Sequence, residues 1–212
     1  MKCDKNVMLL YVVTDRAWVG ELSLYQQVEE ALKNGATCVQ LREKELDEAS
    51  FLEEAIQLKE LCSRYQVPFI VNDNVEIAIA CKADGIHVGQ EDMIASDVRC
   101  RVGEDMIIGV SVHTVEEAVE AVKNGADYLG LGAVFNTSTK LDVDNMSAQM
   151  LKEICDAVDI PTVAIGGISS SNIMEIAGSG VDGVAVVSAI LGAKDIGAAT
   201  RELLAKSKEM VG

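Results

Sequence analysis

Short runs of β-branched and other apolar residues alternate with longer stretches of helical period along almost the whole chain. The runs cover residues 7–15, 36–42, 68–73, 85–90, 106–113, 127–135, 161–167 and 182–188. The helical stretches between and after them cover 24–33, 49–65, 74–82, 92–101, 114–124, 147–157, 170–179 and 192–210. Alternation of this kind is typical of βαβ units, because parallel strands need a long crossover connection. The sequence therefore predicts eight parallel strands and eight helices.

A weak internal echo favours closure of these units into a barrel. The segments 34–37, 82–85, 124–127 and 179–182 each end a helix and begin an even-numbered strand. In three of them a glycine, Gly35, Gly125 or Gly180, stands where a helix needs a left-handed terminal residue. The 212 residues divided by eight give 26.5 residues for each unit, which leaves little room for another domain. We predict a single-domain (βα)8 TIM barrel over 1–212, with a doubly wound open sheet as the alternative.

The charge of the chain restricts its partners. Eighteen Lys and Arg residues against 34 Asp and Glu residues give a net charge of −16, and no basic block interrupts this excess. Such a surface repels nucleic acid and anionic membranes. The apolar run at 7–13 is too short to span a bilayer, and no cleavage-site pattern follows it. We expect a cytoplasmic protein with neither nucleic acid nor membrane as a partner.

Several kinds of reactive centre lack support in the sequence. The six cysteines form no CxxC pair, so reduced and mostly buried thiols are expected rather than disulfides, zinc or iron–sulfur sites. The two histidines, His87 and His113, have no carboxylate at a spacing typical of a triad, and we expect structural roles for both. The chain has no GxSxG segment, no P-loop and no GxGxxG segment that begins a helix. Serine hydrolases, P-loop nucleotidases and classical dinucleotide-binding enzymes are therefore disfavoured.

Polar residues follow nearly every predicted strand, at the end of a (βα)8 barrel where reactive groups gather. Any one of them can be an ordinary loop residue or helix cap, but the whole set favours a binding site. The set consists of Thr14, Asp15, Gln40, Arg42, Lys44, Asn72, Asp73, His87, Gln90, Asp92, Ser111, His113, Thr137, Ser138, Thr139, Lys140, Gly166, Gly167 and Ser188.

The glycines among these residues point to a phosphate ligand. Gly166 and Gly167 follow the seventh strand, and the eighth strand leads into the segment VVSAI. Barrels commonly hold a phosphate at these two places, on backbone N–H groups and a helix N-terminus. On so acidic a chain a polyanion also needs local cations, and Arg42, Lys44 and Lys140 come from strand-end loops.

Two carboxylates at neighbouring strand ends suggest a metal ion. Asp73 and Asp92 offer the hard oxygen ligands that Mg²⁺ takes when it bridges a protein and a phosphate. The alternative is that each carboxylate caps the helix that follows it. The spacing alone leaves both possibilities open.

Nine segments, in order from Tyr11 to Ile190, resemble the thiamine phosphate synthase family: YVVTD, QLREK, ND, ADGIHVGQED, GVSVH, GADYLGLGAVF, TSTK, AIGGI and GVAVVSAI. The short segments occur in other phosphate-binding barrels, whereas the order of all nine is specific. The resemblance implies a transferase that joins a hydroxymethylpyrimidine diphosphate to a thiazole phosphate. Thiamine phosphate and diphosphate would be the products.

The resemblance also implies roles for individual residues. The family's diphosphate pocket falls on Gln40, Arg42, Lys44, Asn72 and Lys140, with Mg²⁺ on Asp73 and Asp92 and the pyrimidine beside Ser111. Its thiazole phosphate site falls on Thr137, Thr139, Gly167, Val187 and Ser188. Lys140 and Ser111 would be the catalytic residues.

The implied reaction needs no protein nucleophile, which agrees with the lack of a triad. The metal ion and the cations would neutralise the departing diphosphate, and the thiazole nitrogen would attack the resulting methylene cation. Water has to be excluded from this cation. The loop 133–145 contains TSTK and no proline, so we expect a lid that becomes ordered when ligand binds. Gly130 and Gly132 before it are expected to act as hinges or to allow close packing.

Two other functions fit the same barrel. A thiazole tautomerase of the same superfamily would share the thiazole phosphate site, but QLREK, Asn72, Asp73 and Lys140 favour the synthase. A non-catalytic ligand-binding barrel would be expected to lose the charged groups at the strand ends. The sequence leaves the oligomeric state open, a homo-oligomer included.

Overall fold

The computed structural model describes residues 3–90, 92–136 and 145–212, and within them eight parallel strands close into a barrel in sequence order. The last strand pairs with the first, with Val184 opposite Leu10. This pairing confirms the predicted (βα)8 fold and excludes the open sheet. The strands are β1 (Leu10–Val13), β2 (Cys38–Leu41), β3 (Phe69–Asn72), β4 (Gly85–Val88), β5 (Ile107–Val112), β6 (Tyr128–Leu131), β7 (Thr162–Ile165) and β8 (Val184–Val186).

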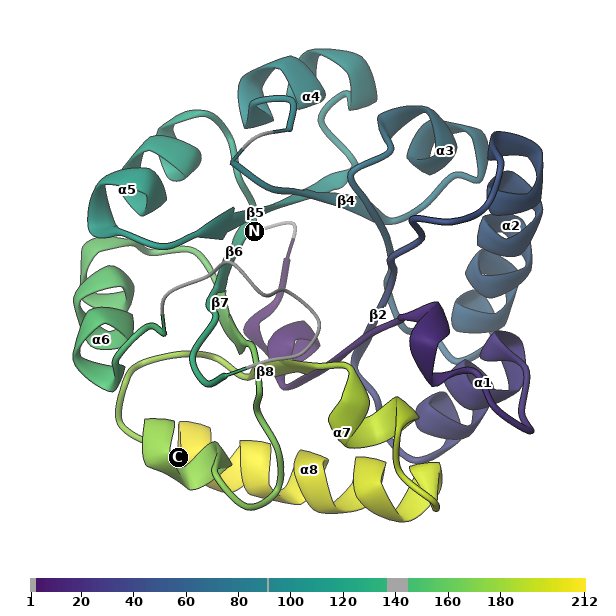
Figure 1. Ribbon diagram of the computed structural model, residues 1–212. Coiled ribbons are helices and arrows are strands. Elements are labelled where there is room, and N and C mark those ends of the chain that lie inside the picture. Colours follow the sequence, from purple (N-terminus) through teal and green to yellow (C-terminus); the bar gives the residue numbers. More distant parts are fainter. Residues whose placement is uncertain (1–2, 91, 137–144) are drawn as a thin grey trace.

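Helices surround the barrel as an outer ring (Figure 1). They are α1 (Leu24–Lys33), α2 (Glu48–Arg64), α3 (Val75–Ala80), α4 (Ala95–Val102), α5 (Val115–Lys123), α6 (Ala148–Ala157), α7 (Ser188–Leu191) and α8 (Ile196–Val211). Three short 3-10 helices accompany them: η1 (Lys5–Met8), η2 (Arg16–Trp18) and η3 (Ile173–Ile176).

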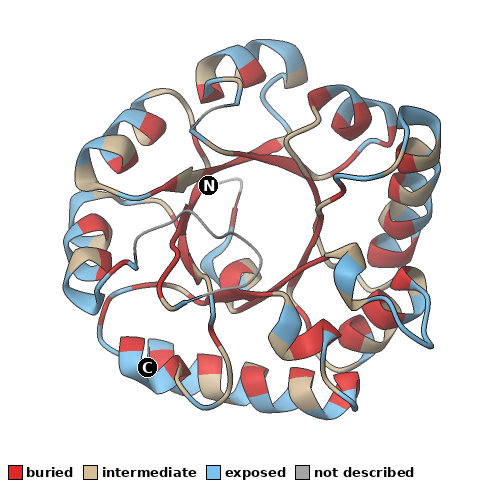
Figure 2. Ribbon diagram, in the orientation of Figure 1, coloured by how far each residue is buried: buried red, intermediate tan, exposed pale blue. Residues whose placement is uncertain are grey.

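The strands are buried on both faces, which explains their continuous apolar runs (Figure 2). Along β1, Leu10 and Val12 belong to the core between the sheet and the helices. Tyr11 and Val13 alternate with them and belong to a second cluster inside the barrel. Met8 of η1 joins that second cluster, so the segment before β1 closes the amino end of the barrel.

The return from β7 to β8 differs from the prediction. The helix expected over 170–179 is reduced to the four residues of η3, and the short helix α7 precedes α8. Asn172 explains the first difference, because its side chain accepts from Ser169 N (2.8 Å) and donates to Gly167 O (3.0 Å). Side chains that bond to nearby backbone compete with a regular helix. Gly178, two residues after the end of η3, has φ of 79°, a left-handed conformation in which a right-handed helix cannot continue.

The four segments of the internal echo have the same structure, which we call the strand-pair clamp. In each segment, one residue just before an even strand makes two hydrogen bonds to a single residue of the preceding odd strand. Its backbone N–H donates to the carbonyl of that odd-strand residue, and its side-chain oxygen accepts from the backbone N–H of that residue. The side-chain bonds are Leu10 N to Thr37 Oγ1 (2.8 Å), Phe69 N to Asp84 Oδ2 (2.8 Å), Ile108 N to Asp127 Oδ2 (2.9 Å) and Thr162 N to Asp182 Oδ2 (2.9 Å). Positive φ at Gly35 and Gly125 confirms the left-handed helix ends expected there. Gly180 and Lys82 also have positive φ, but η3 already ends at Ile176, so the helix end expected at Gly180 is wrong.

All six cysteines are free thiols, as expected, and four of them are buried. Cys155 is half-buried and Cys100 is exposed, so the expectation of mostly buried thiols is confirmed with Cys100 as the exception. Burial raises the pKa of the Cys62 thiol to about 12. None of the helices in the described part of the chain combines the length and the apolar character that crossing a membrane requires.

Candidate active site

A cavity of about 920 Å³ opens at the carboxyl ends of the strands. A volume of this size suits small-molecule ligands. Its lining includes most of the predicted strand-end residues: Gln40, Arg42, Lys44, Asn72, Asp73, His87, Gln90, Asp92, Ser111, His113, Gly166, Gly167, Val187 and Ser188. Thr137, Ser138, Thr139 and Lys140 lie outside the described residues.

Thr14 and Asp15 support the cavity rather than line it. Thr14 is fully buried, and its Oγ1 accepts from the backbone N of Arg42 (3.0 Å). Asp15 pairs with the Arg42 guanidinium (Nη1–Oδ2, 3.2 Å) and caps η2. The end of β1 therefore fixes both the backbone and the side chain of the first predicted cation.

Glu43, between the two cations of QLREK, organises the loop after β2. Its Oε1 accepts from the backbone N–H groups of the next three residues at 2.8, 2.6 and 3.1 Å. Its Oε2 accepts from Arg16 at Nε (2.9 Å) and Nη2 (2.5 Å), and Arg16 also pairs with Glu54. Burial alone raises the pKa of Glu43, but these donors outweigh burial and the pKa is lowered overall. Sequence reasoning missed this residue, although a carboxylate between two site cations was a visible signal.

Asp73 and Asp92 both line the cavity, at the ends of β3 and β4. Asp73 has φ of 61°, a conformation that is rare for a residue with a side chain and frequent at functional sites. Its Oδ2 lies 2.5 Å from Lys44 Nζ, and Asp92 Oδ2 accepts from Gly89 N at 2.7 Å. Neither carboxylate caps the next helix, because the N-caps of α3 and α4 are Asn74 and Ile94. Capping, the alternative expected from the sequence, therefore does not explain them.

These two carboxylates are a partial donor set for Mg²⁺, because the described residues contain no group of three or more His, Cys, Asp and Glu side chains that could hold a metal ion. Both supply hard oxygen atoms, which this ion prefers, and each engages only one oxygen in the contacts described. Their partners, an ammonium group and a backbone N–H, keep the carboxylates in place at the cavity wall.

The two glycines after β7 need their conformational freedom. Gly166 and Gly167 have φ of 102° and 63°. A Cβ at Gly167 would overlap the Asn136 carbonyl, and one at Gly166 would lie 2.6 Å from Ala133 Cβ. Only glycine allows the chain to pass here. After β8, Val187 is the N-cap residue of α7, which begins at Ser188 and has no side-chain cap among the described residues.

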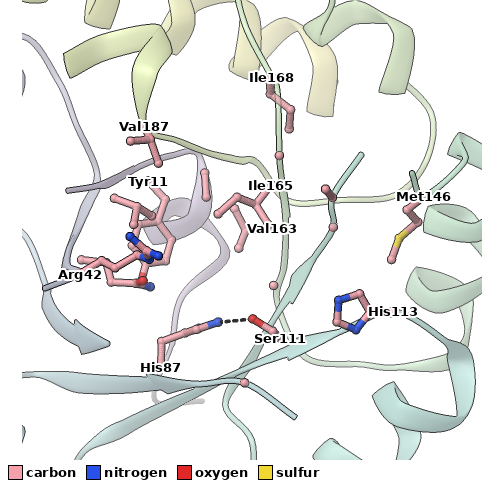
Figure 3. A pocket seen from close by; sticks show the side chains of 18 of the residues that line it. Tyr11, Arg42, His87, Ser111, His113, Met146, Val163, Ile165, Ile168 and Val187 are labelled. Atoms are coloured by element: carbon pink, nitrogen blue, oxygen red, sulfur yellow. Dashed lines mark hydrogen bonds between the residues drawn. The ribbon is translucent and has the colours of Figure 1, made fainter. Parts of the chain in front are cut away.

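The floor of the cavity is polar, contrary to the apolar interior expected for a barrel. His87 Nδ1 lies 2.8 Å from the Tyr128 hydroxyl. Its Nε2 lies 2.8 Å from Ser111 Oγ (Figure 3). These contacts give His87 the partners expected of a structural histidine, but they also connect it to a predicted site residue. His113, at the rim, pairs with Glu117 at 3.3 Å. Tyr11 and Tyr128 were not among the predicted site residues.

Apolar side chains form another part of the cavity wall: Val163, Ile165 and Ile168 come from β7 and its loop, and Met146 lines the same cavity (Figure 3). Such a wall suits the apolar face of a small ring and limits access of water.

The loop expected at 133–145 lies only partly within the described residues. The first described end is tied to β7, because Val134 N donates to Ile165 O (3.0 Å). Met146 N donates to Ala133 O (2.7 Å), so the two described ends are also joined to each other. A Cβ at Gly132 would overlap Ile165 O, and one at Gly130 would lie 3.1 Å from His87 Cε1. Close packing, one of the two roles expected for these glycines, accounts for both.

Comparison with known proteins identifies the family to which this barrel belongs. The family described as thiamine monophosphate synthase matches residues 10–190. The chain belongs to the thiamine monophosphate synthase family. A thiamine-phosphate synthase of Clostridium acetobutylicum is 50% identical over 193 residues, 91% of this chain and 92% of the relative. One of Clostridium tetani is 47% identical over 94% of this chain and 96% of its own. The family resemblance expected from the nine sequence segments is confirmed.

A solved structure agrees with this assignment. The thiamine phosphate pyrophosphorylase from Pyrococcus furiosus matches with a TM-score of 0.88 and 41% identity, over 98% of this chain and 99% of that chain. The similarity thus extends over nearly the full length of both chains.

Proposed function

We propose that this member of the family is a thiamine-phosphate synthase, a transferase that joins hydroxymethylpyrimidine diphosphate to thiazole phosphate and releases diphosphate. The observation that carries the proposal is the composition of one cavity in a barrel of this family. Arg42 and Lys44 lie in its wall with two carboxylates, and Gly167 and Ser188 lie in the same wall. The cavity therefore offers cations for one anionic substrate and a glycine loop for another.

On the pyrimidine side, Gln40, Arg42, Lys44 and Asn72 bind the diphosphate in this proposal. Arg42 and Lys44 each have one carboxylate partner, Asp15 and Asp73, so a diphosphate enters a site whose cations are already oriented. Lys140 belongs to the same group through the family resemblance, and it lies outside the described residues.

Asp73 and Asp92 would hold Mg²⁺, whose charge supports departure of the diphosphate. Lys44, paired with Asp73, keeps that carboxylate at the cavity wall and itself faces the leaving group. The bond between the methylene carbon and the diphosphate oxygen breaks, and both electrons leave with the diphosphate. Arg42 and Lys44 stabilise the charge that develops there.

On the thiazole side, the backbone N–H groups near Gly167, Val187 and Ser188 bind the phosphate in this proposal. Positive φ at both glycines after β7 lets the backbone approach an anion closely. Thr137 and Thr139 complete this group through the family resemblance and lie outside the described residues. The apolar wall of Val163 and Ile165 holds the ring and keeps water from the methylene cation.

The direct test supplies the purified protein with both substrates and Mg²⁺ and measures thiamine phosphate and diphosphate. We expect equal amounts of the two products and none when either substrate is left out. A protein that only isomerises the thiazole, or that only binds it, would refute the proposal.

A pair of lysine variants then tests the site. Lys44→Ala should lower kcat/KM by about 100- to 1,000-fold, the scale for loss of one preorganised electrostatic partner. The matched control is Lys33→Ala on the outer helix α1, where the ammonium pairs only with Glu29 among the described residues. Equal activity of the two variants would remove Lys44 from the site.

A further inference from the structure

Five polar side chains form a continuous chain of hydrogen bonds across the interior of the barrel. Gln40 Nε2 donates to the Tyr11 hydroxyl (2.9 Å), and the Tyr11 and Tyr128 hydroxyls lie 2.8 Å apart. The Tyr128 hydroxyl lies 2.8 Å from His87 Nδ1, and His87 Nε2 lies 2.8 Å from Ser111 Oγ. We call these five residues the interior chain. Both of its ends, Gln40 and Ser111, are predicted substrate-binding residues.

Neighbouring strands make room for the interior chain. Gly109 of β5 lies opposite Tyr128 in the strand register, and a Cβ at Gly109 would overlap the tyrosine ring. A Cβ at Gly130 would lie 3.1 Å from Cε1 of His87. Tyr11 and Tyr128 are at most 1% exposed, and their ring centroids lie 6.0 Å apart. Close packing against Gly109 and Gly130 therefore fixes the positions of the Tyr128 and His87 rings.

The direction of the bonds follows from counting protons. An amide nitrogen only donates, so the Tyr11 oxygen accepts from Gln40. The strongest acceptor within reach of the Tyr11 proton is the Tyr128 oxygen, because its other polar neighbour, the Cys38 thiol, is a weak acceptor. Tyr128 then donates its own proton to His87 Nδ1. Burial raises the pKa of both tyrosines well above the ordinary value, so both keep the protons that this direction requires.

The same count determines the state of His87. With Nδ1 accepting, the ring is neutral and carries its proton on Nε2. Nε2–H then donates to Ser111 Oγ, which accepts and keeps its own proton for another partner. Ser111 lines the cavity, so its proton can be donated to a ligand atom that accepts a hydrogen bond.

We propose that Tyr11, Tyr128 and His87 are positioning residues that hold the Ser111 hydroxyl as a hydrogen-bond donor toward the ligand. The ligand atom they select is an unprotonated ring nitrogen, the acceptor that an aminopyrimidine carries beside its amino group. The identity of this ring rests on the proposed function, whereas the direction of the interior chain does not. Reversal of the chain would turn Ser111 into an acceptor and disfavour that ring.

The first experiment measures the His87 tautomer in the ligand-free protein. The chain has two histidines, so ¹⁵N-histidine labelling with two-bond ¹H–¹⁵N correlations gives two ring systems, and His113→Asn assigns them. We expect neutral His87 with the proton on Nε2 near neutral pH. The opposite tautomer, or a doubly protonated ring, would overturn the proposal.

A substitution at the far end tests the direction. In Gln40→Glu the carboxylate accepts from Tyr11, so each bond reverses and the His87 proton moves to Nδ1. The matched control Gln57→Glu adds the same charge at an exposed position of α2 and should leave the His87 tautomer unchanged. An unchanged tautomer in Gln40→Glu would also overturn the proposal.

The second experiment asks whether the interior chain acts through Ser111. Tyr128→Phe removes one oxygen and should raise KM for the pyrimidine substrate about tenfold, the scale of one well-placed hydrogen bond, with KM for the thiazole unchanged. In a Ser111→Ala background the same change should have no further effect. If Tyr128→Phe does not fold, Tyr11→Phe breaks the chain one bond earlier and replaces it in the cycle.

The outcomes separate the two proposals. Additive effects of Tyr128→Phe and Ser111→Ala would show that the tyrosine acts by packing alone and would overturn the positioning role. Failure of the wild-type protein to make thiamine phosphate would refute the proposed function, and the tautomer and its response to Gln40→Glu would still decide the direction of the chain.

Discussion

Replacement of Glu43 by glutamine tests how the loop after β2 is built. The variant keeps the shape of the side chain, but it replaces one carboxylate oxygen with an NH₂ group that cannot accept. In the wild type both oxygens are used, one by three backbone N–H groups and one by Arg16. Either orientation of the amide therefore places donors against donors.

The magnitude follows from burial of the carboxylate. The Glu43 side chain is 2% exposed, whereas Arg16 is 30% exposed and keeps Glu54 as a second partner. Breaking a buried pair costs about 3–5 kcal/mol, and the partial exposure of Arg16 favours the lower end, about 3 kcal/mol. For a domain of about 150–250 residues this corresponds to a fall of about 6–12 °C in Tm.

Thermal unfolding of Glu43→Gln and of Glu54→Gln provides the measurement. Glu54 is 23% exposed and accepts from the same Arg16 Nη2 atom that donates to Glu43, so its loss should cost less than about 1 kcal/mol. We also expect a larger increase of KM for the pyrimidine diphosphate than for the thiazole phosphate, because Arg42 and Lys44 flank Glu43. If the Tm of Glu43→Gln lay within about 2 °C of the Tm of Glu54→Gln, the loss of about 3 kcal/mol expected for the buried pair would be refuted.

The acid side of the stability curve gives an independent check. Backbone donors and Arg16 lower the pKa of Glu43 below its ordinary value of 4.5 despite burial. The stabilisation is thus present above the unfolded-state pKa and is lost as pH falls through the lower folded-state value. Wild-type stability should therefore fall more steeply below pH 4.5 than that of Glu43→Gln. Parallel curves in that range would contradict the role of the charged form.

Three other outcomes follow from the site and the fold. Asp73→Asn and Asp92→Asn should lower kcat more than they change substrate KM, and EDTA should abolish turnover; full activity in EDTA would exclude the proposed metal. Lys140→Ala should cost about 2–4 kcal/mol of transition-state stabilisation, measured as kcat/KM, and an unchanged value would remove this residue from the site. Gly109→Ala should cost about 1–3 kcal/mol of stability and lower Tm by several degrees, because the new methyl group overlaps the Tyr128 ring. An unchanged Tm would contradict that packing.

The strand ends could be predicted because chain order and strand direction already determine them. In a closed parallel barrel every strand ends at the same face, so Gln40 and Ser111 meet there although 71 residues separate them in the numbering (111 − 40). The helical connections could be predicted from their helical period. The exception is 170–179, where the Asn172 side chain bonds to the backbone and the helix is limited to one turn.

The interior chain could not be predicted because it depends on register. Tyr128 fits only because Gly109 lies opposite it on the neighbouring strand, and pairing between β5 and β6 is set by packing of the whole barrel. His87 has no carboxylate at a spacing typical of a triad, and its partners come from strands 24 and 41 residues further along. Glu43 is a different case, since its partners are the next three residues and a local reading could have found it.

The strand-pair clamps determine where this chain can be opened. Each clamp connects an odd strand to the next even strand, through the segments that contain Thr37, Asp84, Asp127 and Asp182. The helix-to-strand loops at 65–68, 103–106 and 158–161 contain none of these four side chains. A circular permutant that begins in one of those three loops keeps every clamp within one uninterrupted strand pair, whereas new termini at 82–84 or 124–127 divide a clamp at the residue that forms it. The barrel is thus a ring of four two-stranded modules, and its tolerated cut points lie between modules, at the face opposite the chemistry.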